Sequence, residues 1–130
     1  MPTWDDVAQA CLALPGTTEE VSAKGRRRWL VRGWTFVRDR PLHLTDLAEL
    51  GDAAPQGPIV VAYVPDVGVR AALVAAEPDV YFTTTHFAGV PVVQCRLEAL
   101  DPQALTELVT EAWASRASRR LLAEHPPTEA

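Results

Sequence analysis

The stretch Lys24–Arg40, KGRRRWLVRGWTFVRDR, carries a hairpin signal within this 130-residue chain. Two runs rich in aromatic and β-branched residues, 26–31 and 34–38, flank Gly33 at a natural turn position, which predicts a β-hairpin. Strand alternation is expected to place four side chains of the returning strand on one face: Trp34, Phe36, Arg38 and Arg40. The rest of the fold is predicted outward from this hairpin.

The same stretch holds most of the chain's positive charge. Its cations are Lys24, Arg26, Arg27, Arg28, Arg32, Arg38 and Arg40. With Asp39 as the one acid, the stretch carries +6, so the remainder of this −5 chain carries −11. Guanidinium groups bind phosphate in bidentate fashion, and an exposed Trp stacks on bases. We therefore expect these seven residues to contact nucleic acid, with DNA as the expected partner.

An alternative for the same residues is internal pairing with the seventeen acids of the chain. The sequence pI of about 5.1 argues against a nonspecific nucleic-acid coat, because dedicated DNA-binding domains are usually basic. A nucleic-acid role would therefore depend on the local patch alone. Trp29, Phe36, Tyr63 and Trp113 are expected to be buried, and Arg26 and Arg27 to be exposed.

Composition indicates one globular domain. The chain is 48% hydrophobic with four Trp, so we expect a single domain over residues 1–125 and a flexible tail over 126–130. No apolar run reaches the roughly 18 residues of a membrane helix, and no contact with a membrane is expected. Acids near the N-terminus, where a signal peptide is basic and apolar, favour the cytoplasm. Cys11 and Cys95 are expected to be buried thiols.

Helices at both ends enclose a series of strands. Thr3 with Asp6 predicts a capped first helix, and Asp101 with Pro102 predicts the start of a long last helix that keeps its apolar stripe to Leu121. The expected elements between them are a polar loop at 17–20, a short strand at 42–44, a helical turn at 45–50, strands at 59–64, 80–84 and 90–97, and a helix at 67–77. This order predicts an α+β fold, an antiparallel sheet with the N- and C-terminal helices packed on it.

A second candidate site surrounds His86. Its expected members form a ligand cleft: Tyr81, Thr85, His86 and Trp113. It would hold a small anionic ligand or a protein partner. The other histidines are not at metal-ligand spacing, and no nucleophile with its base or glycine-rich phosphate loop is present. We therefore expect no catalytic residues, no metal, no cofactor and no enzyme activity.

Short motifs along nearly the whole chain resemble the MmcQ/YjbR family of small bacterial proteins. They are Leu14-Pro15-Gly16-Thr17, Glu20, Arg28-Trp29, Gly33, Phe36, Arg70-Ala71-Ala72-Leu73, Pro78, Tyr81-Phe82, Thr85-His86-Phe87, Gly89, Pro91, Arg96-Leu97, Leu105 and Glu111-Ala112-Trp113. The resemblance implies a CyaY-like α+β fold, also described as a double-wing motif, and a DNA-binding label that rests on fold analogy. It implies no catalytic residues.

Two positions depart from that family pattern. Trp34 stands directly after the hairpin glycine, where many relatives have Lys, and Ala112-Trp113 replaces a common Ser-Tyr pair. The loss of a Lys at the hairpin tip weakens the nucleic-acid interpretation there, although neighbouring arginines offset it.

Overall fold

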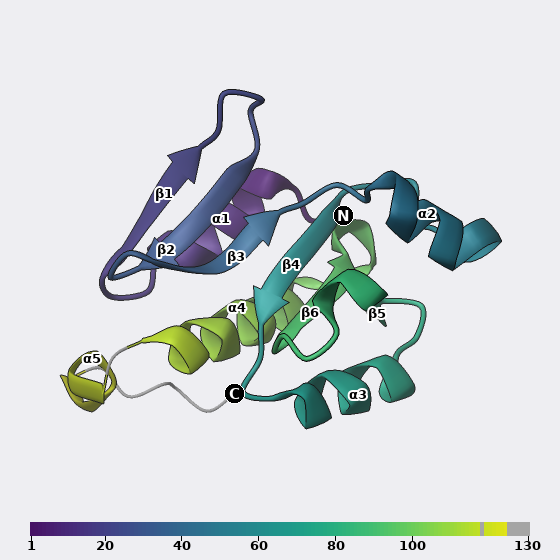
Figure 1. Cartoon of the computed structure of the whole chain (residues 1–130). Helices are drawn as coiled ribbons and strands as arrows, with labels where there is room; N and C mark the ends of the chain where they lie inside the picture. Colours follow the sequence, from purple (N-terminus) through teal and green to yellow (C-terminus); the bar gives the residue numbers. More distant parts are fainter. Residues whose placement is uncertain (118, 125–130) are drawn as a thin grey trace.

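A six-stranded antiparallel sheet in the order β1-β2-β3-β4-β6-β5 forms the centre of the molecule (Figure 1). The computed structural model describes residues 1–117 and 119–124. The strands are β1 (Thr17–Val21), β2 (Arg27–Val31), β3 (Trp34–Asp39), β4 (Ile59–Tyr63), β5 (Tyr81–Phe82) and β6 (Val92–Arg96). The helices are α1 (Trp4–Leu12), α2 (Leu44–Leu50), α3 (Val67–Ala76), α4 (Pro102–Arg116) and α5 (Arg119–Glu124), with short 3-10 turns η1 (Gly51–Ala53), η2 (Thr85–Phe87) and η3 (Leu97–Ala99). The predicted α+β class is confirmed.

The two faces of the sheet differ in what covers them. The helix face packs against α1 and α4, and its central cross-strand row is Trp29, Val37, Ala62 and Val93. The opposite face, called here the open face, carries the row Arg28, Arg38, Val61 and Gln94. The main core lies on the helix face, whereas the described part of the open face holds a small cluster of Val61, Phe87 and Val92 with part of Tyr63.

The hairpin turn and one irregularity set the register of β2 and β3. Arg32 and Gly33 occupy the turn with φ of 50° and 87°, as a two-residue hairpin with positive φ at both positions requires. The register then shifts, so that Leu30 faces Thr35 but Trp29 faces Val37. Phe36 is thus an extra residue, a β-bulge, which reverses the alternation of β3 at that point.

This bulge corrects the predicted grouping of β3 side chains. Arg38 and Arg40 do lie on the open face beside Phe87. Phe36 instead joins the main core, and Trp34 pairs with buried Val31. The prediction that all four share a face is wrong, because one inserted residue shifts the parity of the strand.

Several other elements follow the sequence closely. The capping box of Thr3 and Asp6, the Asp101 cap with Pro102, and the helix ending at Gly51 are all present. The polar loop predicted at 17–20 is instead β1, whose polar side chains suit an edge strand. The short strand predicted at 42–44 is absent from the described residues, because α2 already begins at Leu44 with His43 as its N-cap.

The last helix is shorter than its apolar stripe predicts. α4 ends at Arg116 because Ala117 is extended (φ −68°, ψ 148°), and a separate α5 brings Leu121 back to the core. The predicted tail at 126–130 lies outside the described residues. Cys11 and Cys95 are free and buried, as predicted. Within residues 1–117 and 119–124, no helix is long and apolar enough to cross a bilayer.

Candidate functional site

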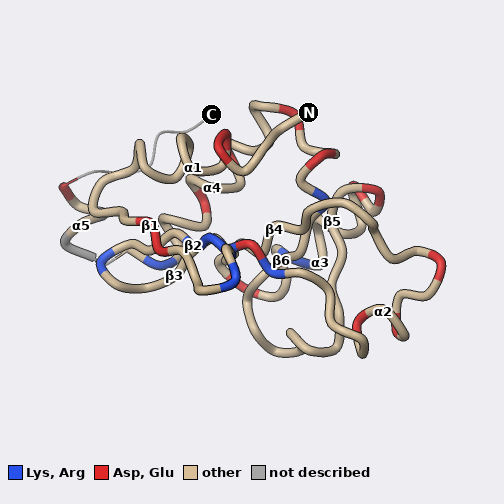
Figure 2. Tube along the Cα trace, turned by 90° about the horizontal axis from the view of Figure 1, so that it is seen from above, with Lys and Arg blue, Asp and Glu red and all other residues tan. Residues whose placement is uncertain are grey.

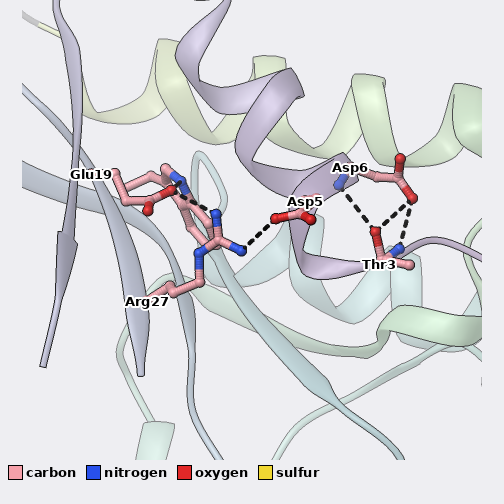
Figure 3. Close-up of polar contacts among 6 residues, drawn as sticks. Thr3, Asp5, Asp6, Glu19 and Arg27 are labelled. Atoms are coloured by element: carbon pink, nitrogen blue, oxygen red, sulfur yellow. Dashed lines mark hydrogen bonds and ion pairs between the residues drawn. The ribbon is translucent and has the colours of Figure 1, made fainter. Parts of the chain in front are cut away.

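Arg27 is held by two acids of its own chain. Its Nη1 donates to Asp5 Oδ1 and its Nη2 to Glu19 Oε1, each at 3.0 Å (Figure 3). Glu19 Oε1 also accepts a 2.8 Å hydrogen bond from Trp29 Nε1, so one carboxylate joins the arginine to the core. The hydrogen bond to Glu19 has the largest effect on the pKa of Arg27, and together with the bond to Asp5 it raises this pKa, although burial acts to lower it. Arg27 is therefore half-buried and neutralised, not freely exposed as predicted.

Arg26 and Arg28 also have acidic partners. Arg26 Nη1 lies 3.3 Å from Asp39 Oδ2, and Arg28 Nε donates to Glu20 Oε1 at 2.9 Å. Both arginines are on the surface, with about half of each side chain exposed (52% and 51%). In Figure 2 the red segment of β1 lies beside the blue segment of β2, in keeping with the pairing of Arg28 with Glu20. Exposed ion pairs of this kind add little stability but reduce the charge offered to a partner.

Arg40 is buried, not part of the surface. It is 5% exposed, and its Nη1 donates to buried Asp46 Oδ2 at 3.1 Å. Burial acts to raise the pKa of Asp46, but bonds from the His43 backbone N–H and from Arg40 outweigh it and hold this pKa below its usual range. Arg40 Nη2 has no hydrogen-bond acceptor in the described part of the chain. The pair anchors α2 to the open face.

Three of the seven predicted cations have no acidic partner among the described residues: Lys24, Arg32 and Arg38. Lys24 lies in the β1–β2 turn and Arg32 at the β2–β3 turn, both exposed. Arg38 lies mid-strand on the open face. The segment therefore does not form one uninterrupted free cationic face, and its contact with nucleic acid stays a prediction.

Arg38 lines a hollow of about 260 Å³ on the open face, named here the open-face pocket. Its lining residues are Arg28, Thr35, Phe36, Arg38, Val61, Tyr63, Phe87, Val90 and Val92. The carbon of the Arg38 guanidinium lies 6.0 Å from the centre of the Phe87 ring, and that of Arg40 lies 4.9 Å from it. Phe87 thus stands beside both the pocket arginine and the buried arginine.

The electrostatics of the pocket centre on Arg38. Burial lowers the pKa of Arg38, and the charges of Arg40 and Arg28 lower it further. Arginine nevertheless stays protonated in proteins. The pocket therefore holds a positive charge that the described chain leaves uncompensated, and an anion placed beside it would relieve this repulsion.

Arg70 fixes the loop that carries Phe87. Its Nη1 lies 2.9 Å from Phe87 O, 2.8 Å from Val90 O and 3.3 Å from Val92 O. On the other side of the loop, Glu49 of α2 accepts from the backbone N–H of Thr85 at 3.1 Å. Two charged side chains from separate helices therefore hold one wall of the pocket in place.

The cleft predicted around His86 is not formed. Tyr81 and Trp113 are buried in the main core, where Trp113 Nε1 donates to Pro15 O at 2.9 Å. Burial raises the pKa of Tyr81 to about 12. Thr85 and His86 are exposed on η2, with the His86 ring edge-on to Phe87. The structure therefore places only Thr85 and His86 together.

A larger hollow, of about 580 Å³, lies between the starts of α1 and α4. Its carboxylates, Asp6 and Asp101, are already bonded to the backbone N–H groups of their own helices. Both carboxylates of this hollow therefore already have hydrogen-bond donors within the chain. Among the described residues, no group of three or more His, Cys, Asp or Glu is arranged to hold a metal.

Sequence reasoning missed Thr35, Tyr63 and Phe87 as pocket residues. Tyr63 and Phe87 meet the hairpin only through the pairing of β3 with β4 and of β4 with β6. These contacts join residues far apart in sequence, and no local pattern encodes them. The one available signal was Arg38 itself, a cation within the predicted strand 34–38.

The fold and this pocket define a small α+β domain whose antiparallel sheet is packed by helices on one face and only partly covered on the other. The crystal structure of the Deinococcus radiodurans protein DR2400, a DUF419 domain, has the same fold, with a TM-score of 0.69 and 15% identity over 100% of this chain and 97% of that one. No family model matches the chain.

Curated relatives are closer in sequence. The uncharacterized proteins Rv2570 of Mycobacterium tuberculosis and Mb2600 of Mycobacterium bovis are each 42% identical over 125 residues, which cover 94% of this chain and of each relative. The chain belongs to the family of these mycobacterial proteins.

Proposed function

We propose that this domain is a non-enzymatic binding module that takes a small anionic ligand in the open-face pocket. The observation that carries the proposal is Arg38, a partly buried guanidinium with no acidic or hydrogen-bond partner among the described residues. A charge removed from water without a partner is unfavourable. An anion that pairs with it gains a charge-assisted hydrogen bond in a setting of reduced dielectric.

A small ligand is favoured over a polymer because most of the cationic segment is already neutralised. Arg26, Arg27 and Arg28 each pair with carboxylates of the chain, and Arg40 pairs with buried Asp46. A polymer of phosphates would have to displace these carboxylates. A single anion at Arg38 displaces none.

The test is a calorimetric and thermal-shift screen of small anions against the full chain and two variants. Arg38→Met removes the pocket charge. Arg32→Met removes a charge that has no acidic partner among the residues described and that lies at the hairpin turn, outside the pocket. A ligand of the folded state raises the melting temperature. We expect at least one anion to bind the wild type and Arg32→Met but not Arg38→Met. Equal binding to all three, or to none, would contradict the proposal.

DNA binding is the second candidate, and the hairpin tip favours it. Trp34 is 62% exposed next to Arg32, which has no acidic partner in the described part of the chain, and the two offer a base-stacking surface beside a phosphate contact.

We also propose membership of the MmcQ/YjbR family, supported by the sequence motifs and by the fold shared with a DUF419 domain. A cytoplasmic location is a further proposal, supported by the two free buried thiols.

Filter binding of a short duplex across a range of salt concentrations tests the DNA proposal. Each phosphate contact contributes about −0.9 to the slope of log affinity against log salt. Binding through the three cations of residues 24–40 that have no acidic partner among the described residues therefore predicts a slope of about −3. Arg32→Ala and Trp34→Ala should each weaken binding. The absence of binding at low salt would end this candidate.

A further inference from the structure

Among the described residues that line the open-face pocket, one cation has no acidic partner. Arg28 donates to Glu20 and the neighbouring Arg40 pairs with Asp46, whereas Arg38 has no such pair in the described chain. A ligand with one negative charge matches this count. A dianion would bring a second charge beside Val61, Phe87 and Val92, and the described residues that line the pocket include no second cation without an acidic partner.

The walls of the pocket are mostly apolar and aromatic. Val61, Val90 and Val92 line it together with the rings of Tyr63 and Phe87. Its volume of about 260 Å³ is close to the lower end of the roughly 300–1,000 Å³ typical of small-molecule sites. The ligand therefore has a compact hydrocarbon body, and a flat ring suits two aromatic side chains.

The polar groups of the pocket lie together at the hairpin. Arg28 Nη1 is 3.5 Å from Thr35 Oγ1, and Arg28 and Arg38 are directly paired across β2 and β3. Apart from Phe36 of β3, the apolar groups come from β4, β6 and the Phe87 loop. The pocket is thus amphipathic, with a cationic edge and an apolar edge.

We propose that the ligand is a small aromatic monocarboxylate, its carboxylate on Arg38 and its ring against Phe87 and Tyr63. This inference rests on the proposed function, because it specifies the anion that the same pocket takes. Carboxylate and guanidinium form two parallel hydrogen bonds, which fixes the orientation of the ring.

Four probes separate the contributions of the ligand's negative charge and of its hydrocarbon group to the affinity: phenylacetate, acetate, phenylacetamide and inorganic phosphate. Titrations of the ¹⁵N-labelled full chain, followed by NMR, give affinities and map the residues that respond. We expect phenylacetate to bind about tenfold or more tightly than each of the other three probes. Acetate lacks the aromatic ring, phenylacetamide lacks the negative charge, and phosphate lacks a hydrocarbon group. The largest shifts should fall on the amides of Arg38, Tyr63 and Phe87.

Two variants and one control complete the test. Arg38→Met should abolish the preference for phenylacetate over phenylacetamide, and Phe87→Leu should abolish its preference over acetate. Arg32→Met should change neither. The spectrum of each free variant shows whether it is folded.

Failure of this inference and failure of the proposed function give different results. Phosphate binding at Arg38 as tight as or tighter than that of phenylacetate would overturn the aromatic monocarboxylate and leave an anion-binding module. No response to any probe would overturn both. Phenylacetate affinity unchanged in Arg38→Met would overturn the placement of the carboxylate.

Discussion

Arg28 and Arg38 face each other across the β2–β3 ladder, so two guanidinium groups occupy one directly paired position on the open face. Like charges in such a position destabilise a sheet. Glu20 neutralises Arg28, whereas Arg38 has no acid beside it in the described chain. The sheet therefore carries a local repulsion at the place where a ligand is proposed.

Removing the Arg38 charge should stabilise the free domain. We expect Arg38→Met to raise the free energy of unfolding by about 0.5–1 kcal/mol, because it relieves the cross-strand repulsion and keeps the aliphatic stem. Urea unfolding followed by circular dichroism measures this as a higher midpoint with an unchanged slope. Arg32→Met is the matched control and should stay within about 0.5 kcal/mol of wild type. A less stable Arg38→Met protein would mean that Arg38 contributes to stability, not to a site.

The buried pair of Arg40 and Asp46 should be sensitive to the loss of one partner. We expect Asp46→Asn to destabilise the domain by about 3–5 kcal/mol, because it leaves a charged guanidinium buried without a counter-ion. The double variant Arg40→Met with Asp46→Leu should recover most of this loss, since it replaces the pair by apolar groups. Urea unfolding of the three proteins checks it, and equal stability of Asp46→Asn and wild type would contradict the pairing.

Protonation of Asp46 in acid should weaken its ion pair with Arg40. The pKa of Asp46 is lower in the folded protein than the unfolded value of about 3.9, so its contribution to stability is full above that value and is lost as pH falls through the folded pKa. Wild type should therefore lose stability below about pH 4 more steeply than the double variant without the pair. Unfolding curves between pH 2 and pH 6 measure the difference. Parallel curves would show that Asp46 titrates normally.

Loss of Arg70 should loosen the Phe87 loop without unfolding the sheet. Arg70→Met removes a charged donor shared by the carbonyl groups of Phe87, Val90 and Val92, and each such bond is worth about 1.5–3 kcal/mol. Hydrogen exchange at the Val90 and Val92 amides should become about tenfold faster or more. Exchange in β2 is the internal control and should not change. Unaltered exchange in the loop would show that the hydrogen bonds of Glu49 to the Thr85 backbone are enough to keep the Phe87 loop in place.

Both thiols should be inert in the folded protein. Burial raises the pKa of Cys95 to about 12 and also raises that of Cys11, so neither forms the reactive thiolate near neutral pH. We expect a thiol reagent such as Ellman's to detect neither cysteine under native conditions and both in denaturant. Rapid native reaction of either residue would contradict its burial.

The sequence predicted the hairpin because Gly33 and the flanking β-formers act locally. It did not predict which charges meet. With an ideal two-residue turn, Arg28 would face Val37, but the extra residue Phe36 shifts the register and brings Arg38 opposite instead. The pairing of Arg27 with Asp5 and of Arg40 with Asp46 likewise depends on tertiary packing, and charge counting treated both arginines as free.

The same limit explains the last helix and the cleft at His86. The stripe from Leu105 to Leu121 fits one helix, yet Ala117 is extended and α5 reaches the core separately. Tyr81 and Trp113 belong to the helix-face core, where their rings pack, whereas Thr85 and His86 lie in the exposed η2 turn. Adjacency in sequence therefore said little about which side chains share a cavity.

The stacking of Arg116 gives the protein an optical reporter of its own. The guanidinium carbon of Arg116 lies 5.1 Å from the centre of the Trp34 ring and 4.2 Å from that of Tyr63, which lines the open-face pocket. Trp29 and Trp113 are buried, and Trp4 stacks on Trp29, so Trp34 is the indole most open to a collisional quencher. Intrinsic fluorescence, without any label, can therefore follow events at the edge of this pocket.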